Sequence, residues 1–176
     1  DGKTIYSCSW DDQRIIKWDA QSGKILKQFI QVKSPVNGIV LSHSSQWLAC
    51  KNDDGVFLLN TNDFSTYRKL PMSNAKQIQF SDDDKLLFVA TSEYKKEKIL
   101  TYSISDSKLL QSMPGIYSPD AMCIHHDMVV LSNYESLVCY QLSTQKKIGA
   151  WAKDSLRYTT STLNEAGTQL AYALED

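Results

Sequence analysis

Short apolar runs alternate with polar turns along the whole chain of 176 residues. The runs are rich in β-branched and aromatic residues, which is typical of strands, and no segment of a dozen residues keeps the apolar spacing of a helix. The pattern therefore predicts an all-β protein. The expected strands are residues 4–9, 14–18, 25–30, 36–41, 47–50, 56–59, 66–70, 77–80, 86–91, 99–104, 109–113, 122–124, 128–131, 137–142, 147–151, 158–163 and 169–174.

The strands recur in units of nearly constant length. An apolar anchor of each unit falls at Ile5, Leu48, Leu87, Val129 and Leu170, in steps of 43, 39, 42 and 41 residues. A period of about 40–45 residues built only from short strands is typical of a four-stranded β-propeller blade. The sequence therefore predicts a propeller of four-stranded antiparallel blades, with units at roughly 1–30, 35–70, 75–113, 121–151 and 157–176.

The predicted strands number three in the first unit, four in each of the next three and two in the last. We therefore expect about four blades that begin and end mid-blade, as part of a larger ring. A seven-bladed ring at this period needs on the order of 290 residues. The alternative is a four-bladed ring closed by joining the last strands to the first, which would also remove exposed strand edges.

The first unit carries a more specific pattern. It contains Ser7, then Asp11 and Asp12 in a turn, then the pair Trp18-Asp19 at a strand end. This resembles the WD-repeat (WD40) propeller family, in which a serine, a turn aspartate and the strand-end tryptophan share a buried hydrogen-bond network. The resemblance implies that Ser7, Trp18 and either Asp11 or Asp12 form this network.

The later units depart from the family pattern. Asp53 occupies the position of the turn aspartate in the second unit, but Leu59, Tyr102 and Tyr140 replace the tryptophan. The chain therefore resembles a divergent member. Residues 5–29 and 34–39 are most similar to the WD-repeat subunits of the small-subunit processome, which are scaffolds of pre-ribosomal RNA processing. This resemblance implies an intracellular protein of the nucleus or nucleolus; the cytoplasm is the alternative.

The charge and the apolar runs of the chain indicate which classes of partner to expect, and the cysteine spacing indicates the state of the thiols. Nineteen Lys and Arg balance twenty Asp and Glu, so no global field favours nucleic acid or anionic lipid. No run approaches the roughly 20 apolar residues of a membrane helix, and no membrane partner is expected. The four cysteines lack short metal-type spacing and are interpreted as reduced, buried, small side chains; a disulfide or a metal site is the alternative.

The sequence predicts no catalytic, cofactor-binding or metal-binding residue, and no cofactor. The acidic pairs and triplet at 11–12, 53–54 and 82–84 fall in turns, where aspartate commonly serves the backbone. His43, His125 and His126 are interpreted as surface histidines, because spacing alone identifies no further ligands converging on them.

The hairpin at residues 93–98 is longer than its counterparts in the other units. One interpretation is a solvated turn. The other is a partner-binding tip formed by Tyr94, Lys95, Lys96 and Lys98, since an aromatic beside lysines can stack on a base or guanidinium and pair with phosphate or carboxylate.

Two functional classes remain. A propeller enzyme, such as a lactonase or dehydrogenase, needs polar groups on its innermost strands, and the corresponding segments 36–41, 77–80, 122–124 and 158–163 are mostly apolar. This favours a non-catalytic scaffold that binds other proteins of a multi-subunit complex. Ribosome biogenesis is the leading expectation, with trafficking, ciliary or signalling complexes as alternatives. Any RNA contact is expected to be local and basic, at the 93–98 hairpin.

Overall fold

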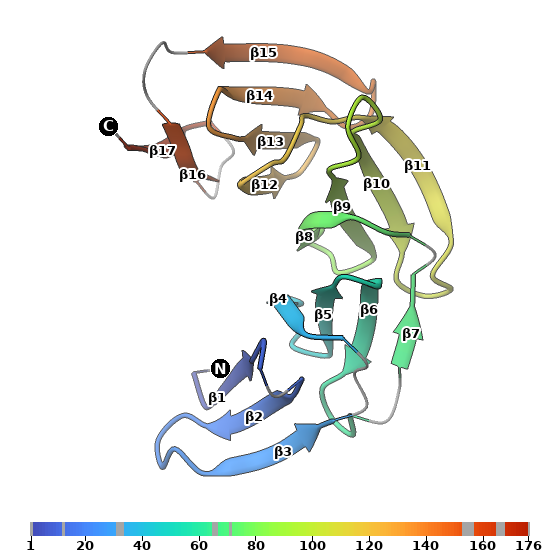
Figure 1. Cartoon of the computed structure of the whole chain (residues 1–176), viewed down its shortest axis with the longest axis vertical. Coiled ribbons are helices and arrows are strands. Elements are labelled where there is room, and N and C mark those ends of the chain that lie inside the picture. The colour runs from blue at the N-terminus through green and yellow to red at the C-terminus, as the bar shows by residue number, and fades with distance from the viewer. Residues whose placement is uncertain are drawn as a thin grey trace. The chain divides into compact units, whose positions relative to one another are not determined.

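The computed structural model describes residues 2–11, 13–30, 34–64, 67–70, 72–152, 157–164 and 168–175. Within these ranges the chain is built from seventeen β-strands and contains no helix (Figure 1). The all-β prediction is confirmed, and each strand lies within two residues of its predicted bounds. None of the described segments forms a helix that could cross a membrane.

The strands form five antiparallel sheets, each made of strands consecutive in the chain. The first two sheets contain β1 (Thr4–Cys8), β2 (Ile15–Asp19) and β3 (Ile25–Phe29), then β4 (Val36–Leu41), β5 (Trp47–Asn52), β6 (Gly55–Asn60) and β7 (Tyr67–Lys69). The third sheet contains β8 (Ala75–Phe80), β9 (Leu86–Thr91), β10 (Lys98–Ser103) and β11 (Leu109–Pro114). The last two contain β12 (Ala121–His125), β13 (Met128–Ser132), β14 (Ser136–Gln141) and β15 (Lys146–Ala152), then β16 (Arg157–Leu163) and β17 (Leu170–Glu175).

The turn into the last strand of the sheet is similar in the first four sheets. A residue with positive φ lies in this turn each time: Gly23, Phe64, Ser107 and Gln145. In the first three cases its amide donates to the carbonyl oxygen four residues earlier. A register shift follows beside Trp18, Tyr102 and Tyr140. This shared local geometry accounts for the nearly constant spacing of the strands along the sequence.

Side-chain hydrogen bonds fix the turn between the first two strands of several sheets. Ser42 Oγ accepts the amide of Trp47 at 3.1 Å, and Ser81 Oγ accepts that of Leu86 at 3.0 Å. Asn164 Oδ1 accepts the amide of Gln169 at 2.9 Å. These are the side-chain-to-backbone bonds for which serine and asparagine are favoured in turns.

The chain divides into two compact parts, residues 1–73 and residues 74–176, and each contains more than one of the repeats described above. We call these two parts the first unit and the second unit of the structure. In the first unit, one apolar core lies between the two sheets and includes Ile15, Phe29, Leu48, Phe57 and Leu59. In this unit Lys17 Nζ donates to the carbonyl of Thr61 at 3.3 Å, which ties the two sheets together at one end.

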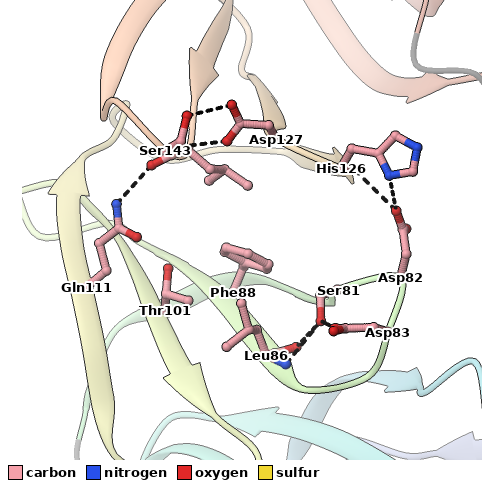
Figure 2. Close-up of a pocket in the computed structure, with 11 residues that line it drawn as sticks. Ser81, Asp82, Asp83, Leu86, Phe88, Thr101, Gln111, His126, Asp127 and Ser143 are labelled. Carbon is pink, nitrogen blue, oxygen red and sulfur yellow. Dashed lines mark hydrogen bonds and ion pairs between the residues drawn. The ribbon is translucent and has the colours of Figure 1, made fainter.

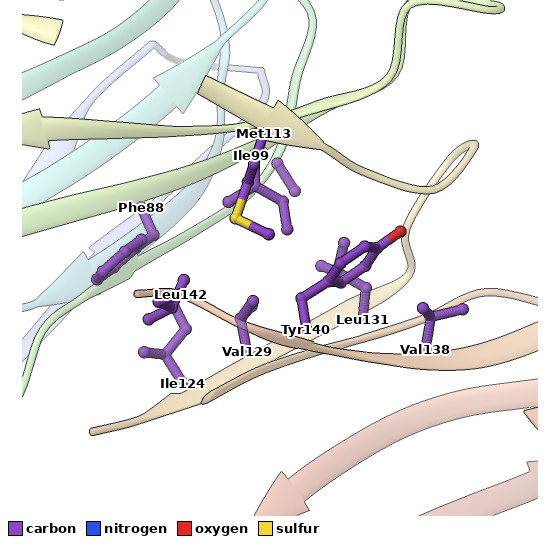
Figure 3. Close-up of a cluster of buried hydrophobic side chains, with 10 residues drawn as sticks. Phe88, Ile99, Met113, Ile124, Val129, Leu131, Val138, Tyr140 and Leu142 are labelled. Atoms are coloured by element: carbon purple, nitrogen blue, oxygen red, sulfur yellow. The ribbon is translucent and has the colours of Figure 1, made fainter. Parts of the chain in front are cut away.

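The second unit packs its sheets face to face. Its largest core lies between the β8–β11 sheet and the β12–β15 sheet (Figure 3). Ile99, Val129 and Leu131 are fully buried there, and Tyr140 donates its hydroxyl to the Gly115 carbonyl at 3.2 Å. A smaller core continues between β12–β15 and β16–β17.

The cysteines belong to these cores. Cys50, Cys123 and Cys139 are buried, Cys8 is half-buried, and all four are free thiols. Burial raises the pKa of Cys50 well above the usual value of a thiol, so this side chain acts as a small apolar group.

Candidate functional site

The first sheet contains part of the expected hydrogen-bond network. Trp18 is the second-last residue of β2, and its indole Nε1 donates to Ser7 Oγ on β1 at 2.8 Å. Ser7 pairs directly with Ile16 in the antiparallel register, so Trp18 lies diagonally across from it. Both side chains are half-buried. The bond thus joins β1 and β2, two adjacent strands of the first sheet.

Asp11 is not part of this network in the described residues. Asp11 is exposed in the β1–β2 turn, where its amide donates to Ser9 Oγ at 3.3 Å; among the described residues no hydrogen bond links its carboxylate to Ser7 or Trp18. Asp12 lies outside the described residues. Asp53 is exposed in the β5–β6 turn, and its sheet has Leu59 where an indole would be needed.

The 93–98 hairpin connects β9 and β10 and presents Tyr94, which is 70% exposed. Lys95 Nζ lies 5.3 Å from the centre of the Tyr94 ring, and Lys96 forms an ion pair with Glu93 at 2.8 Å. The pKa of Lys96 is raised, mainly because its ammonium donates a hydrogen bond to Glu93 and secondly because Glu93 is negatively charged. Lys98 begins β10, with an exposed side chain and a backbone amide that donates to Thr91 Oγ1.

One further loop contacts this hairpin, and a second turn is hydrogen-bonded to that loop. Tyr117, in the β11–β12 loop, contacts the Tyr94 ring edge-on with centroids 5.9 Å apart. Asn133 donates its side-chain amide to the Tyr117 carbonyl at 2.7 Å, which fixes the β13–β14 turn against the same loop. That turn carries Tyr134, which is 45% exposed, and Tyr117 is 47% exposed. We call Tyr94, Tyr117 and Tyr134 the tyrosine surface; the hairpin was predicted, but its two partners were not.

A cavity of about 440 Å³ lies at the opposite end of the same strands (Figure 2). Its walls come from the β8–β11 and β12–β15 sheets. Leu86, Phe88 and Leu142 supply apolar surface. Thr101 and Gln111 supply polar groups, and the Gln111 amide donates to the Leu142 carbonyl at 3.0 Å. The rim is polar and consists of Ser81, Asp82, Asp83, His126, Asp127 and Ser143.

Two rim carboxylates are fully engaged in local bonds. Asp83 accepts the Ser81 hydroxyl and the Lys85 amide, which lower its pKa to about 2. Asp127 accepts the Ser143 hydroxyl at 2.6 Å and the Gln141 amide at 2.9 Å. The Ser143 hydroxyl is the main cause of the lowered pKa of Asp127. Asp83 therefore stabilises its own turn, whereas Asp127 joins the β12–β13 turn to the end of β14 and the turn that follows it.

Asp82 behaves differently from Asp83. Its Oδ2 lies 3.2 Å from His126 Nδ1 and 3.5 Å from His125 Nδ1, and it also accepts the His126 amide at 3.2 Å. One donor atom from each of the three side chains falls within 4.8 Å of the others. The sequence interpretation of both histidines as surface residues is wrong for His125, whose side chain is only 15% exposed. Its ring packs on that of His126, with centroids 4.0 Å apart.

The cavity wall also contains an unpartnered hydroxyl. Thr101 is 3% exposed, and its Oγ1 has no hydrogen-bond partner among the described residues. Figure 2 shows this hydroxyl directed into the cavity. Sequence reasoning did not find it, because Thr101 is an ordinary strand residue by type and position.

Comparison with known proteins informs the fold alone. No family model matches the chain, and no curated protein matches it. Among solved structures 1164 chains match, so the fold is widespread. One is "Kuenenia stuttgartiensis Hydrazine Synthase", with a TM-score of 0.84 and 14% identity over 99% of this chain. The chain spans 53% of that neighbour's length. At this identity the likeness shows a shared fold and carries nothing about activity.

Proposed function

We propose that the chain is part of a divergent WD-repeat β-propeller that serves as a non-catalytic scaffold for protein assembly. The repeated antiparallel sheets support the propeller, as do the similar turns into their last strands and the register shift found in three of them. The Ser7–Trp18 bond supports the WD-repeat assignment of the first sheet. A ring of about seven blades fits this proposal because it lets every sheet face pack on a neighbouring sheet.

The observation that carries the scaffold role is the tyrosine surface. Three loops bring Tyr94, Tyr117 and Tyr134 to one end of the second unit, each at least 45% exposed. Tyrosine is enriched at protein interfaces and among the residues that dominate binding energy, since it offers a rigid apolar ring with a polar tip. Asn133 and the ring contact hold the loops in place, so binding would require little further ordering of them.

The charges beside this surface favour a protein partner over RNA. Glu93 pairs with Lys96 and so neutralises one lysine of the hairpin, and the net charge of the whole chain is only −1. Phosphate binding depends on cations that are not neutralised locally. We therefore expect aromatic and apolar contacts to dominate, with any RNA contact secondary. The leading assignment is a complex of ribosome biogenesis, which rests on the sequence resemblance of residues 5–29 and 34–39.

The test is affinity purification of the full-length protein from cells, followed by mass spectrometry and RNA sequencing. We expect ribosome-assembly factors and precursor rRNA with the wild type, and loss of these proteins with the triple substitution Tyr94→Ala, Tyr117→Ala and Tyr134→Ala. Tyr172→Ala is the matched control, because Tyr172 is 53% exposed on β17. An unchanged partner set in the triple variant contradicts the proposed surface.

Other outcomes distinguish the alternatives. Recovery with membrane-coat, ciliary or signalling proteins would remove the ribosomal assignment and leave the scaffold role. A metal- or cofactor-dependent turnover by the purified protein would instead favour the propeller-enzyme alternative, with the cavity of the second unit as the first place to look for its site.

A further inference from the structure

The Asp82–His125–His126 cluster joins two turns from different sheets. Asp82 lies in the β8–β9 turn, whereas His125 ends β12 and His126 lies in the β12–β13 turn. Adjacent strand residues normally point to opposite faces of a sheet. His126 has a φ of +49°, and this left-handed conformation brings its ring against that of His125. Two imidazoles therefore face one carboxylate.

The distances match those of a tetrahedral metal site. Zinc binds imidazole nitrogen and carboxylate oxygen at about 2.0–2.2 Å, which places neighbouring donors of a tetrahedron about 3.3–3.6 Å apart. The two Nδ1 atoms lie 3.5 Å and 3.2 Å from Asp82 Oδ2. These two separations are close to those of a tetrahedral site, and one donor atom of each of the three residues lies within 4.8 Å of the others.

The surroundings of the cluster also favour an ion over simple hydrogen bonding. A separation of 3.5 Å between His125 Nδ1 and Asp82 is too long for a strong hydrogen bond. His125 Nε2 is buried and has no partner among the described residues. When Nδ1 binds the ion, Nε2 carries the ring proton, so this buried atom lies outside the proposed ligand set. The His126 amide, 3.2 Å from Asp82 Oδ2, holds the carboxylate in place as outer-shell bonds do at metal sites.

We propose that Asp82, His125 and His126 bind a zinc ion whose fourth position faces the cavity of the second unit. Asp82 and His126 line that cavity, and the unpartnered Thr101 hydroxyl lies in its wall. Three protein ligands with one open position leave room for water or a small anion as the fourth ligand. The ion would link the β8–β9 turn to the β12–β13 turn and so connect two sheets. This site is independent of the scaffold role.

The experiment uses the tag-free full chain after removal of metals by a chelator. Isothermal titration with Zn²⁺ should show one site per chain, and Mg²⁺ in excess should not compete, because Mg²⁺ prefers oxygen ligands. Co²⁺ should give the visible absorption bands of a four-coordinate ion. Zn²⁺ should also raise Tm by on the order of 5 °C, since an ion bound only to the folded state stabilises it.

Substitutions assign the ligands. His126→Ala and Asp82→Asn should each weaken zinc binding by at least about 100-fold, since loss even of an outer-shell partner costs about 10–100-fold. His126 is 73% exposed, so its substitution should leave the fold intact. Asp83→Asn is the matched control on the same turn, and His43→Ala is the control for a histidine outside the cluster; both should bind zinc like the wild type.

Two results would overturn the proposal. One is the absence of a Zn²⁺ site in the folded wild-type chain. The other is a site whose affinity is unchanged in His126→Ala and Asp82→Asn, which would place the ion elsewhere. If Asp82→Asn disturbs folding, as judged by circular dichroism, the His126→Ala titration and the Co²⁺ spectrum decide alone.

Discussion

Asp82 and His126 are 44 positions apart in the chain and meet through two contacts. Both the backbone amide and the ring Nδ1 of His126 lie 3.2 Å from the same carboxylate oxygen of Asp82. Among the described residues, the bonds of the neighbouring Asp83 stay within its own turn, to Ser81 and Lys85. Two adjacent carboxylates therefore have separate roles, since one stabilises a turn and the other reaches the next sheet.

The unpartnered hydroxyl of Thr101 predicts a stabilising substitution. Thr101→Val replaces a buried hydroxyl, which has no partner in the described part of the chain, with a methyl group of similar size, and should stabilise the fold by roughly 1 kcal/mol. Thr91→Val is the matched control: Thr91 Oγ1 bonds both the amide and the carbonyl of Lys98, so its loss should destabilise by about 1 kcal/mol. Urea unfolding measures both. Equal destabilisation by the two variants would show that a water or ligand satisfies Thr101.

The Ser7–Trp18 bond should be measurable as a coupling energy. Trp18→Phe keeps an aromatic ring but removes the indole donor, and Ser7→Ala removes the acceptor. Each should cost about 1 kcal/mol, and the double variant should cost less than the sum by roughly 0.5–1.5 kcal/mol. Ser9→Ala, in the adjoining turn, is the control. A coupling energy near zero would mean that this bond contributes nothing to the first sheet.

The pKa of Asp83 predicts a loss of stability in acid. Its folded pKa is about 2 against the ordinary 3.8, mainly because the carboxylate accepts the Ser81 hydroxyl. The contribution is therefore fully present above pH 3.8 and is lost as the pH falls through about 2. Tm should drop over this range in the wild type and drop less steeply in Asp83→Asn. Parallel Tm profiles for the two proteins would contradict the lowered pKa.

The core between the third and fourth sheets predicts a large difference between two leucines. Leu131 on β13 is fully buried, so Leu131→Ala should destabilise by about 2–5 kcal/mol. Leu110 on β11 is 60% exposed, and Leu110→Ala should stay within about 0.5 kcal/mol of wild type. Chemical denaturation of the full chain gives both values. Similar costs for the two substitutions would contradict the packing of these sheets.

Local features of the fold could be predicted from the sequence, whereas the sites that join separate segments could not. Strands and turns follow from apolar runs and from residues such as Ser42 and Asn164, whose bonds span five positions. The Asp82–His126 contact depends on sheet packing and on the left-handed backbone at His126, neither of which is a sequence pattern. Tyr94 was recognisable in its long hairpin, but Tyr117 joins it only through the folded loops.

The most direct test of the scaffold proposal is site-specific photo-crosslinking in cells. A photoreactive amino acid placed at Tyr94 in the full-length protein should crosslink to one of the proteins recovered by affinity purification, because this ring is 70% exposed at the centre of the proposed contact. The same amino acid at Tyr172, 53% exposed on β17, should give no such product. Equal crosslinking at both positions, or none at Tyr94, would contradict the account.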